Sequence, residues 1–174
     1  RQDFDHFEII VIDDGSTDES LAVMKAIIDP RLRVFSQSNA GVERARNFGF
    51  SQSSGSFIVF LDADDLMRSN RLSKQIALFN SDQYLILVGT WANVIDHSEK
   101  VTGSICPPTS NAAIQLGHLF RNQFVNSSVM VRRSAIADGL IFNETRGKRF
   151  AEDFDLWNRV LKKGQATNIP EKLT

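Results

Sequence analysis

Acidic side chains follow apolar segments at two places in the first half of this chain. Five apolar residues, 57–61, lead directly into Asp62 and Asp64, and a β-branched segment ends at Asp13 and Asp14. Carboxylate oxygens held close together are the ligands that a divalent cation such as Mg²⁺ or Mn²⁺ requires. Because alternate side chains of a strand share one face, we expect Asp62 and Asp64 to bind such a cation directly or through water. A solvated turn or a helix N-cap is the alternative.

A further acidic pair, Glu152 and Asp153, begins an amphipathic segment that ends at Gly164. Two interpretations of this pair remain open. Acids at a helix N-terminus are favoured by the helix dipole whatever else they do. Alternatively, one carboxylate faces a cleft as a general base and takes a proton from an acceptor hydroxyl. Burial or neighbouring acids would then raise its pKa towards the working pH.

A glycine turn and a basic helix lie between the two acidic strands. Asn39 and Gly41 belong to the turn, and Arg44 and Arg46 follow it on the predicted helix. Arginines two residues apart do not share a helix face, so at most one of them is expected to reach a cleft. The acids after the first strand can accept hydrogen bonds from a nucleotide base or ribose, and Gly15 lets the backbone approach a ligand closely.

Alternating strands and helices are predicted to position these residues. The predicted strands are 7–12, 32–35, 57–61, 84–91 and 127–131, and the predicted helices are 19–28, 42–49, 69–79, 111–120 and 152–163. This alternation indicates an α/β fold with a mostly parallel sheet, in which ligands bind beyond the carboxyl ends of the strands. Ser16 and Glu19 have the spacing of a capping box for the first helix. Residues 142–150, with Gly147 and four charged side chains, predict a mobile surface loop.

Composition narrows the class of protein. The 174 residues are enough for one domain, and a hydrophobic share of 42% builds a core without disulfides. The 20 basic and 21 acidic residues nearly cancel, and no basic block is present that would follow a phosphate backbone, so nucleic acid is excluded as a partner. The single cysteine, Cys106, fits a reducing compartment, and no apolar run approaches the length needed to span a bilayer.

With these residues assembled, the chain resembles the inverting family 2 glycosyltransferases of the GT-A fold. The segments that carry the resemblance are 7–18, 39–41 with 45–49, 60–65 and 152–157. The resemblance implies a Rossmann-like, mostly parallel sheet flanked by helices, with a smaller mixed region on the acceptor side. Residues 1–174 would form a single domain, in which 1–93 bind a nucleotide-sugar and 94–174 hold the acceptor and the catalytic base. The family's opening strand would precede Arg1 and further contacts would follow Thr174, so this domain is expected to be truncated at both ends.

The resemblance also implies a role for each acidic segment. Asp64, together with Asp62, would bind Mg²⁺ or Mn²⁺ at the diphosphate of the donor. Asp153 would be the base that deprotonates the acceptor hydroxyl. The implied substrate-binding residues are Asp13, Asp14, Asn39, Gly41, Arg46, Asp62 and Glu152.

The expected activity is transfer of a sugar, with inversion, from a nucleotide-sugar such as a UDP-sugar to a glycan or lipid-linked acceptor, as in surface polysaccharide synthesis. We expect a cytoplasmic protein that associates peripherally with the inner face of the membrane through its acceptor. Two other classes remain open: a non-catalytic sugar-nucleotide-binding domain, and a metal-dependent nucleotidyl or phosphoryl transferase. The last would need a phosphate-binding lysine or a nucleophilic aspartate at a strand end, and no such lysine follows either acidic strand.

Overall fold

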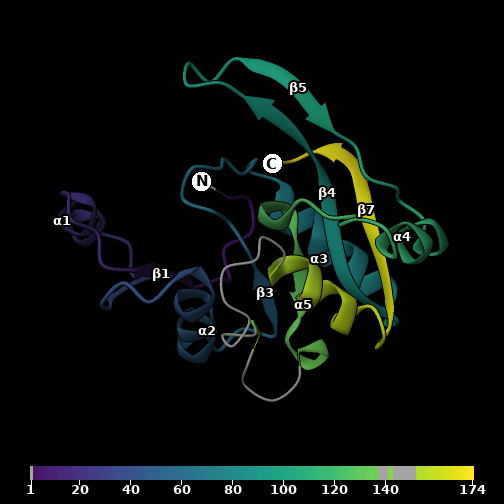
Figure 1. The fold of residues 1–174 in the computed structure, drawn as a ribbon, viewed down its shortest axis with the longest axis horizontal. Coiled ribbons are helices and arrows are strands. Elements are labelled where there is room, and N and C mark those ends of the chain that lie inside the picture. The colour runs from purple at the N-terminus through teal and green to yellow at the C-terminus, as the bar shows by residue number, and fades with distance from the viewer. Residues whose placement is uncertain (1, 137–140, 143–151) are drawn as a thin grey trace.

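The computed structural model describes residues 2–136, 141–142 and 152–174, and Figure 1 shows its fold. The strands are β1 (Ile9–Asp13), β2 (Leu32–Ser36), β3 (Phe57–Val59), β4 (Leu85–Ile95), β5 (Val101–Ile105), β6 (Met130–Arg132) and β7 (Gln165–Lys172). The helices are α1 (Ser20–Ala26), α2 (Val42–Gln52), α3 (Arg71–Ser81), α4 (Asn111–His118) and α5 (Glu152–Val160), with 3₁₀ turns at Asn126–Ser128 and Arg133–Ala135. The predicted elements are present with shifted ends, and the loop predicted over 142–150 lies, beyond Phe142, outside the described residues.

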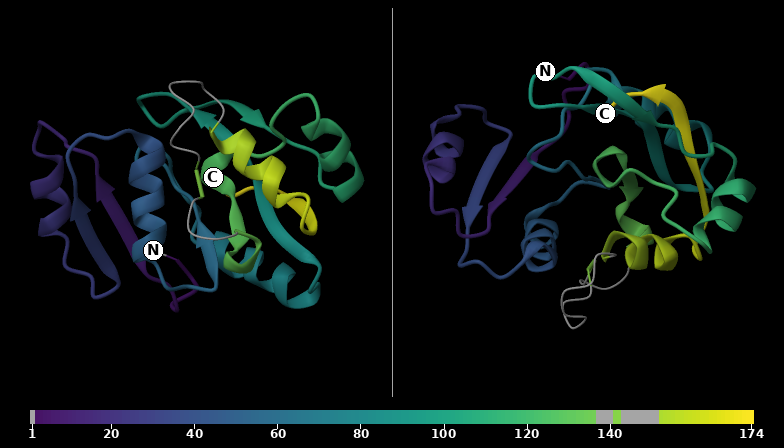
Figure 2. Two further views of the ribbon diagram at one scale, coloured as in Figure 1. Left: turned by 60° about the horizontal axis from the view of Figure 1, so that its bottom comes forward. Right: turned by 45° about the horizontal axis from the view of Figure 1, so that its top comes forward.

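The α/β class is confirmed, and the strand pairing is mixed. β1 and β2 form a parallel pair, while a second sheet has the order β3-β6-β4-β5 with β7 also paired to β4. In that second sheet β7 runs parallel to β4, whereas the β3–β6, β4–β6 and β4–β5 pairs are antiparallel. The short turn after β4 accounts for one antiparallel pair, because a tight turn cannot join parallel neighbours. In both views of Figure 2 the β1–β2 pair lies at one end of the molecule, and β4, β5 and β7 lie at the other.

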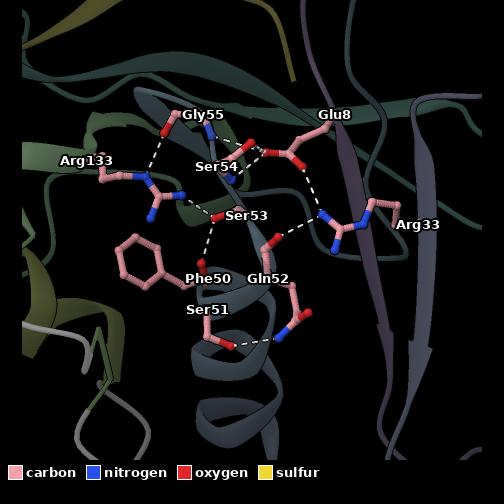
Figure 3. A network of polar contacts seen from close by, with 9 residues as sticks. All are labelled: Glu8, Arg33, Phe50, Ser51, Gln52, Ser53, Ser54, Gly55 and Arg133. Atoms are coloured by element: carbon pink, nitrogen blue, oxygen red, sulfur yellow. Dashed lines mark hydrogen bonds and ion pairs between the residues drawn. The ribbon is translucent and has the colours of Figure 1, made fainter.

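A polar network ties the β1–β2 pair to the second sheet (Figure 3). Glu8 Oε1 accepts hydrogen bonds from the backbone N–H groups of Ser54 and Gly55, at 2.6 and 3.1 Å. Arg33 on β2 contacts Glu8 and donates to the carbonyl of Gln52 at 2.9 Å. Arg133 Nε donates to the carbonyl of Gly55 at 2.7 Å from the other side. Side chains from both sheets therefore converge on the segment between α2 and β3.

Aromatic packing holds α5 against the carboxyl end of β3. Trp157 is fully buried, and its ring centroid lies 5.7 Å from that of Phe60 and 6.3 Å from that of Phe124. Phe60 also meets Phe142 edge to face at 5.9 Å. Such aromatic contacts add about 0.5–1.5 kcal/mol per pair beyond the buried area. The acids at the start of α5 are thereby brought towards the end of β3.

The first helix differs from its prediction. Ser16 and Glu19 form no capping box: the N–H of Ser16 donates to Asp13 Oδ1, and α1 begins at Ser20, whose N–H donates to Asp18 Oδ1. The carboxylate that ends β1 captures the donor that the capping box would have used. None of the α1 residues is buried.

Within the described ranges, no helix combines the length and the apolar character that crossing a bilayer requires.

Candidate active site

Asp13 joins the ends of β1 and β2. Only 3% of its surface is exposed, and Oδ2 accepts a hydrogen bond from the Ser36 hydroxyl at 2.7 Å while Oδ1 accepts from the N–H of Ser16 at 3.0 Å. Hydrogen bonding by Ser16, and then by Ser36, holds the pKa of Asp13 below its ordinary value. The residue is therefore ionised at neutral pH and shapes the turn after β1.

Asp14 holds the turn that leads into α2. Its Oδ1 accepts from the Gln37 amide at 2.7 Å and from the N–H of Ala40 at 2.9 Å, and its Oδ2 accepts from the N–H of Gly41 at 2.9 Å. Burial raises the pKa of Asp14, but these hydrogen bonds outweigh burial and leave the pKa below its ordinary value. Most of its acceptor capacity is thus used by its own chain.

Two glycine turns touch beside these acids. Gly15 has φ +80°, and a Cβ at this position would lie 2.7 Å from the backbone nitrogen of Asn39. Gly41 has φ +95° and directly precedes α2. Both backbone conformations disfavour residues with a side chain. The sequence-predicted residues Asn39 and Gly41 therefore lie against the turn after β1.

Asp62, Ala63, Asp64 and Asp65 form a turn rather than the end of a strand. β3 stops at Val59, and the N–H of Asp65 donates to the carbonyl of Asp62 at 3.1 Å. The strand predicted over 57–61 is therefore present only as Phe57–Val59, and its predicted continuation through residues 60 and 61 is wrong. The inference that Asp62 and Asp64 share a strand face fails with it, because strand alternation does not apply in a turn. We call residues 62–65 the acidic turn.

Packing explains where the strand ends. Phe60 points into the core, whereas Leu61 is 45% exposed. The N–H of Phe60 still reaches the carbonyl of Val129 at 3.2 Å, but the N–H of Asp62 donates to the hydroxyl of Ser127 at 3.0 Å. A side chain has replaced the backbone partner there, so the ladder stops and the chain turns.

A buried arginine supports the start of the acidic turn. Arg71 is fully buried on α3, and its guanidinium donates to the carbonyls of Phe60 and Val129, both at 3.3 Å, and to that of Ser127. Burial lowers the pKa of Arg71 to about 10, against the opposing charge of Asp65. The side chain remains a cation at neutral pH and fixes three carbonyls around the base of the acidic turn.

Arg46 connects two other sequence-predicted site residues from distant segments. Its Nη2 lies 2.7 Å from Asp62 Oδ1, and its Nη1 lies 3.1 Å from Glu152 Oε1. Its guanidinium also stands over the ring of Phe142, with 5.3 Å from Cζ to the centroid. The expectation that at most one of the two arginines turns inward agrees with the exposure of Arg44 and the 18% exposure of the Arg46 side chain. Both ends of the guanidinium are occupied by carboxylates.

Asp153 lies next to this junction, in a partly buried position. Its Oδ2 accepts from the Asn122 amide at 2.8 Å and its Oδ1 from the N–H of Phe154 at 2.7 Å. Burial raises the pKa of Asp153, and the charge of Glu152 adds to the rise. The hydrogen bond from Phe154 and the charge of Arg46 oppose it. A carboxylate with a raised pKa is suited to accepting a proton.

A cleft of about 670 Å³ lies between β1 and α1 on one side and the acidic turn on the other. Asp13 and Asp14 line it together with Ala63 of the acidic turn, and Val23 and Met24 supply an apolar wall. Its volume lies within the range of small-molecule pockets, about 300–1,000 Å³. Two of the acidic segments therefore border one cleft.

The acidic turn has the donor chemistry of a Mg²⁺ or Mn²⁺ site. Asp64 is exposed, and no group in the part of the chain that the structure describes donates a hydrogen bond to its carboxylate. Asp62 keeps Oδ2 for a ligand, because Arg46 holds Oδ1. The described residues contain no group of three or more acidic, histidine or cysteine side chains able to hold a metal by themselves. Mg²⁺ is commonly bound through one or two carboxylates, with water and substrate phosphates as its other ligands.

Sequence reasoning missed the residues that support these acids. Asn122, Ser127 and Arg71 contact Asp153, Asp62 and the base of the acidic turn, yet none belongs to a recognisable pattern. Each is a single polar residue far along the chain from the group it supports. The buried Arg71 was detectable only as a charge on the apolar side of a predicted helix.

The chain is similar to known glycosyltransferases. The chain is 29% identical to an uncharacterized glycosyltransferase of Haemophilus influenzae, over 99% of this chain and 57% of that protein. It is 25% identical to the Escherichia coli UDP-Glc:α-D-GlcNAc-diphosphoundecaprenol β-1,3-glucosyltransferase WfgD, over 97% of this chain and 64% of WfgD. The chain thus spans less than two thirds of the length of these relatives.

A solved structure shows the fold, and a family model shows the family. The crystal structure of residues 1–349 of S. aureus TarS superposes with a TM-score of 0.76 at 21% identity, covering 98% of this chain and 51% of that TarS fragment, which shows a common fold. The profile of Glycosyl transferase family 2 matches residues 1–138. The chain therefore belongs to glycosyl transferase family 2.

Proposed function

We propose that this protein is a metal-dependent, inverting glycosyltransferase that moves a sugar from a nucleotide-sugar to a glycan or lipid-linked acceptor. The observation that carries the proposal is the bridge from Arg46 to Asp62 and Glu152, because it joins the acidic turn to the helix that bears Asp153. In this assignment the donor lies against the acidic turn and the acceptor hydroxyl meets Asp153.

Asp153 acts as the general base. Its carboxylate takes the proton of the acceptor hydroxyl as the oxygen forms a bond to the anomeric carbon, and the bond from that carbon to the nucleoside diphosphate breaks. Attack from the side opposite the leaving group inverts the anomeric configuration. The raised pKa of Asp153 supports this role, because a stronger base accepts a proton more readily near neutral pH.

Asp64 and Asp62 are the residues that would hold Mg²⁺ or Mn²⁺ near the donor diphosphate. When bound, the cation offsets the negative charge that develops on the leaving group. The exposed carboxylate of Asp64 supports this assignment, since it is open to a ligand that arrives with the donor. Asp13 and Asp14 border the uracil or ribose from the opposite wall of the cleft, next to the turn of Asn39 and Gly41.

The donor is a UDP-sugar and the acceptor a glycan or polyprenyl-diphosphate-linked saccharide. The name of WfgD, which specifies UDP-Glc and a diphosphoundecaprenol-linked acceptor, supports this choice. An acceptor of this kind fits a cytoplasmic protein that works at the inner face of the membrane in surface polysaccharide synthesis.

A sugar-transfer assay with a panel of nucleotide-sugars and lipid-linked saccharides, using the full-length protein and added Mg²⁺ or Mn²⁺, tests the proposal. Asp153→Asn is expected to lower kcat by about 10²–10⁴-fold, because it removes the base. Asp64→Asn is expected to abolish the response to added metal. Asp155→Asn is the matched control, since this acid on α5 pairs with Arg159 at 3.2 Å instead.

Three results would contradict the proposal. Binding of UDP-sugars without turnover would identify a non-catalytic domain. Release of phosphate or pyrophosphate from a nucleotide without sugar transfer would identify a phosphoryl or nucleotidyl transferase. Undiminished transfer by Asp153→Asn would remove Asp153 as the base.

A further inference from the structure

Asn122 makes a side-chain contact with Asp153 that no sequence motif indicates. Its Nδ2 lies 2.8 Å from Asp153 Oδ2, across 31 positions of the chain. Its Oδ1 accepts a hydrogen bond from the N–H of Phe124 at 3.0 Å. One short amide side chain therefore spans the distance between its own loop and the carboxylate at the start of α5.

The second contact fixes the orientation of the amide. An N–H group can donate only to an acceptor, so the Asn122 oxygen must face Phe124. The NH₂ group is then directed at Asp153, where it meets a carboxylate oxygen that accepts hydrogen bonds in its ionised form. Asn122 cannot reverse this arrangement without losing both hydrogen bonds.

Among the described residues, Asn122 is the neutral side chain that donates a hydrogen bond to the carboxylate of Asp153. The charged or titratable groups that act on Asp153 are Glu152 beside it, Arg46 from α2 and His118 from α4. His118 is 2% exposed, its ring centroid lies 4.6 Å from that of Phe154, and burial lowers its pKa, so it is neutral at pH 7. Its Nδ1 accepts from the N–H of Gln123 at 3.3 Å, which holds the loop next to Asn122.

We propose that Asn122 is the positioning residue of the catalytic base: its amide holds Oδ2 of Asp153 and thereby directs the remaining carboxylate lone pairs at the acceptor hydroxyl. This inference rests on the proposed function, in which Asp153 is that base. The donated hydrogen bond also favours the ionised carboxylate, which is the form that can take a proton.

Two variants of the full-length protein test it. Asn122→Ala removes both hydrogen bonds. Asn122→Asp keeps an oxygen that accepts from Phe124 but replaces the NH₂ group with a second carboxylate oxygen. Both are expected to lower kcat by about 10- to 100-fold with the nucleotide-sugar KM within about threefold of wild type, because a misdirected base slows the chemical step. The matched control is Gln115→Ala, which removes a hydrogen bond from α4 to the carbonyl of Leu161 without touching Asp153.

The pKa of Asp153 provides the second measurement and does not depend on turnover. It is followed by carboxylate-carbon NMR in labelled protein, with the resonance assigned through Asp153→Asn. We expect the pKa of Asp153 to rise in Asn122→Ala, and to rise further in Asn122→Asp because like charges repel. The pKa in Gln115→Ala should stay at the wild-type value.

The inference is overturned if the pKa of Asp153 is unchanged in both Asn122 variants, or if both keep wild-type kcat while Asp153→Asn is inactive. Failure of the proposed function gives a different result: Asp153→Asn retains full transfer, or the wild-type protein binds the donor without turnover. In that case the NMR measurement still decides whether Asn122 donates a hydrogen bond to Asp153. An unchanged pKa of Asp153 in the Asn122 variants would show that this contact does not exist.

Discussion

The guanidinium of Arg46 donates to Asp62 at 2.7 Å, and through this contact a residue of α2 fixes the first acid of the acidic turn. The second arm of the same side chain reaches Glu152 at 3.1 Å. The planar fork of arginine holds two carboxylates at a fixed spacing, whereas the donors of an ammonium group share one nitrogen on a flexible stem. Arg46 thus sets the position of the acidic turn relative to the start of α5.

Replacing Arg46 by lysine tests this relation. The positive charge is kept, but one of the two carboxylates loses its partner. We expect kcat/KM for sugar transfer to fall by about 10- to 100-fold, because the groups on the two sides of the reacting sugar are misplaced. Steady-state kinetics on Arg46→Lys, with the exposed Arg44→Lys as the control, checks this. Equal activity of the two variants would contradict the role of Arg46.

The pH dependence of transfer follows from the raised pKa of Asp153. A base must be deprotonated to act, so kcat/KM is expected to fall as pH drops through this pKa, above the ordinary value of 3.8. Arg46 lowers the pKa of Asp153, so Arg46→Met should move this acidic limb to higher pH. A pH–rate profile of both proteins measures the shift. A limb that moves to lower pH, or stays in place, would show that Arg46 does not act on the base.

The acidic residues themselves could be predicted from the sequence because each follows or begins a segment with clear periodicity. Their local geometry could not be predicted in the same way. An apolar run such as 57–61 has the composition of a strand, but the strand stops at Val59 because Ser127 and Arg71 supply side-chain partners in place of a ladder. These partners come from distant parts of the chain, so local propensity carries no information about them.

The direction in which neighbouring strands run could not be predicted from the sequence pattern either. Alternating strands and helices favour parallel pairing, yet β6 runs antiparallel between β3 and β4. This strand, Met130–Arg132, is only three residues long, and so short a segment fits a sheet in either direction. Asn122 illustrates the same limit for the site, since a lone asparagine in a loop resembles any turn residue until its partner Asp153 is placed.

The close contact between Gly15 and Asn39 predicts a strong effect of adding one methyl group. Gly15→Ala is strained twice, by φ +80° and by a Cβ that would lie 2.7 Å from a backbone nitrogen. We expect the free energy of unfolding to fall by about 1–3 kcal/mol and nucleotide-sugar binding to weaken. Gly103→Ala is the control, because its Cβ would lie at an ordinary 3.8 Å from Val94. Urea unfolding and calorimetric titration with a UDP-sugar compare the two. Similar unfolding free energies and similar binding for the two variants would show that the turns at Gly15 and Asn39 can move apart without cost.

Glu8 makes the attachment of the β1–β2 pair sensitive to pH. The backbone hydrogen bond from Ser54 lowers the pKa of Glu8 from 4.5, with smaller lowering by Gly55 and Arg33, against the effect of burial. Its stabilisation is therefore complete above pH 4.5 and is lost as pH falls through the lower folded-state pKa. We expect Glu8→Gln to lower the free energy of unfolding at pH 7 by about 1 kcal/mol.

Unfolding of wild type and Glu8→Gln at a series of pH values tests this coupling. The difference in unfolding free energy between the two proteins should shrink as pH drops below 4.5. Glu43→Gln on α2 serves as the control for loss of a carboxylate elsewhere. A difference that grows towards low pH would contradict the assignment.

Arg71 supports the base of the acidic turn. Its loss should lower the free energy of unfolding and weaken binding of the nucleotide-sugar. Arg71→Met removes the donor to the carbonyls of Phe60, Ser127 and Val129 in a buried site. The carbonyl of Val129 keeps the N–H of Phe60 as a partner. Each buried carbonyl left without a partner costs about 1–3 kcal/mol, so the free energy of unfolding is expected to fall by about 2 kcal/mol or more.

Because the same carbonyls fix the base of the acidic turn, the variants of Arg71 that remain folded should also bind the nucleotide-sugar more weakly. Arg71→Lys keeps one donor group and provides a folded variant if Arg71→Met does not accumulate. Arg68→Met, an exposed arginine next to the start of α3, should leave both quantities at the wild-type values. Thermal unfolding together with calorimetric donor binding measures both effects. If Arg71→Lys loses stability but binds the donor as tightly as wild type, the buried arginine holds the core alone and the acidic turn keeps its shape without it.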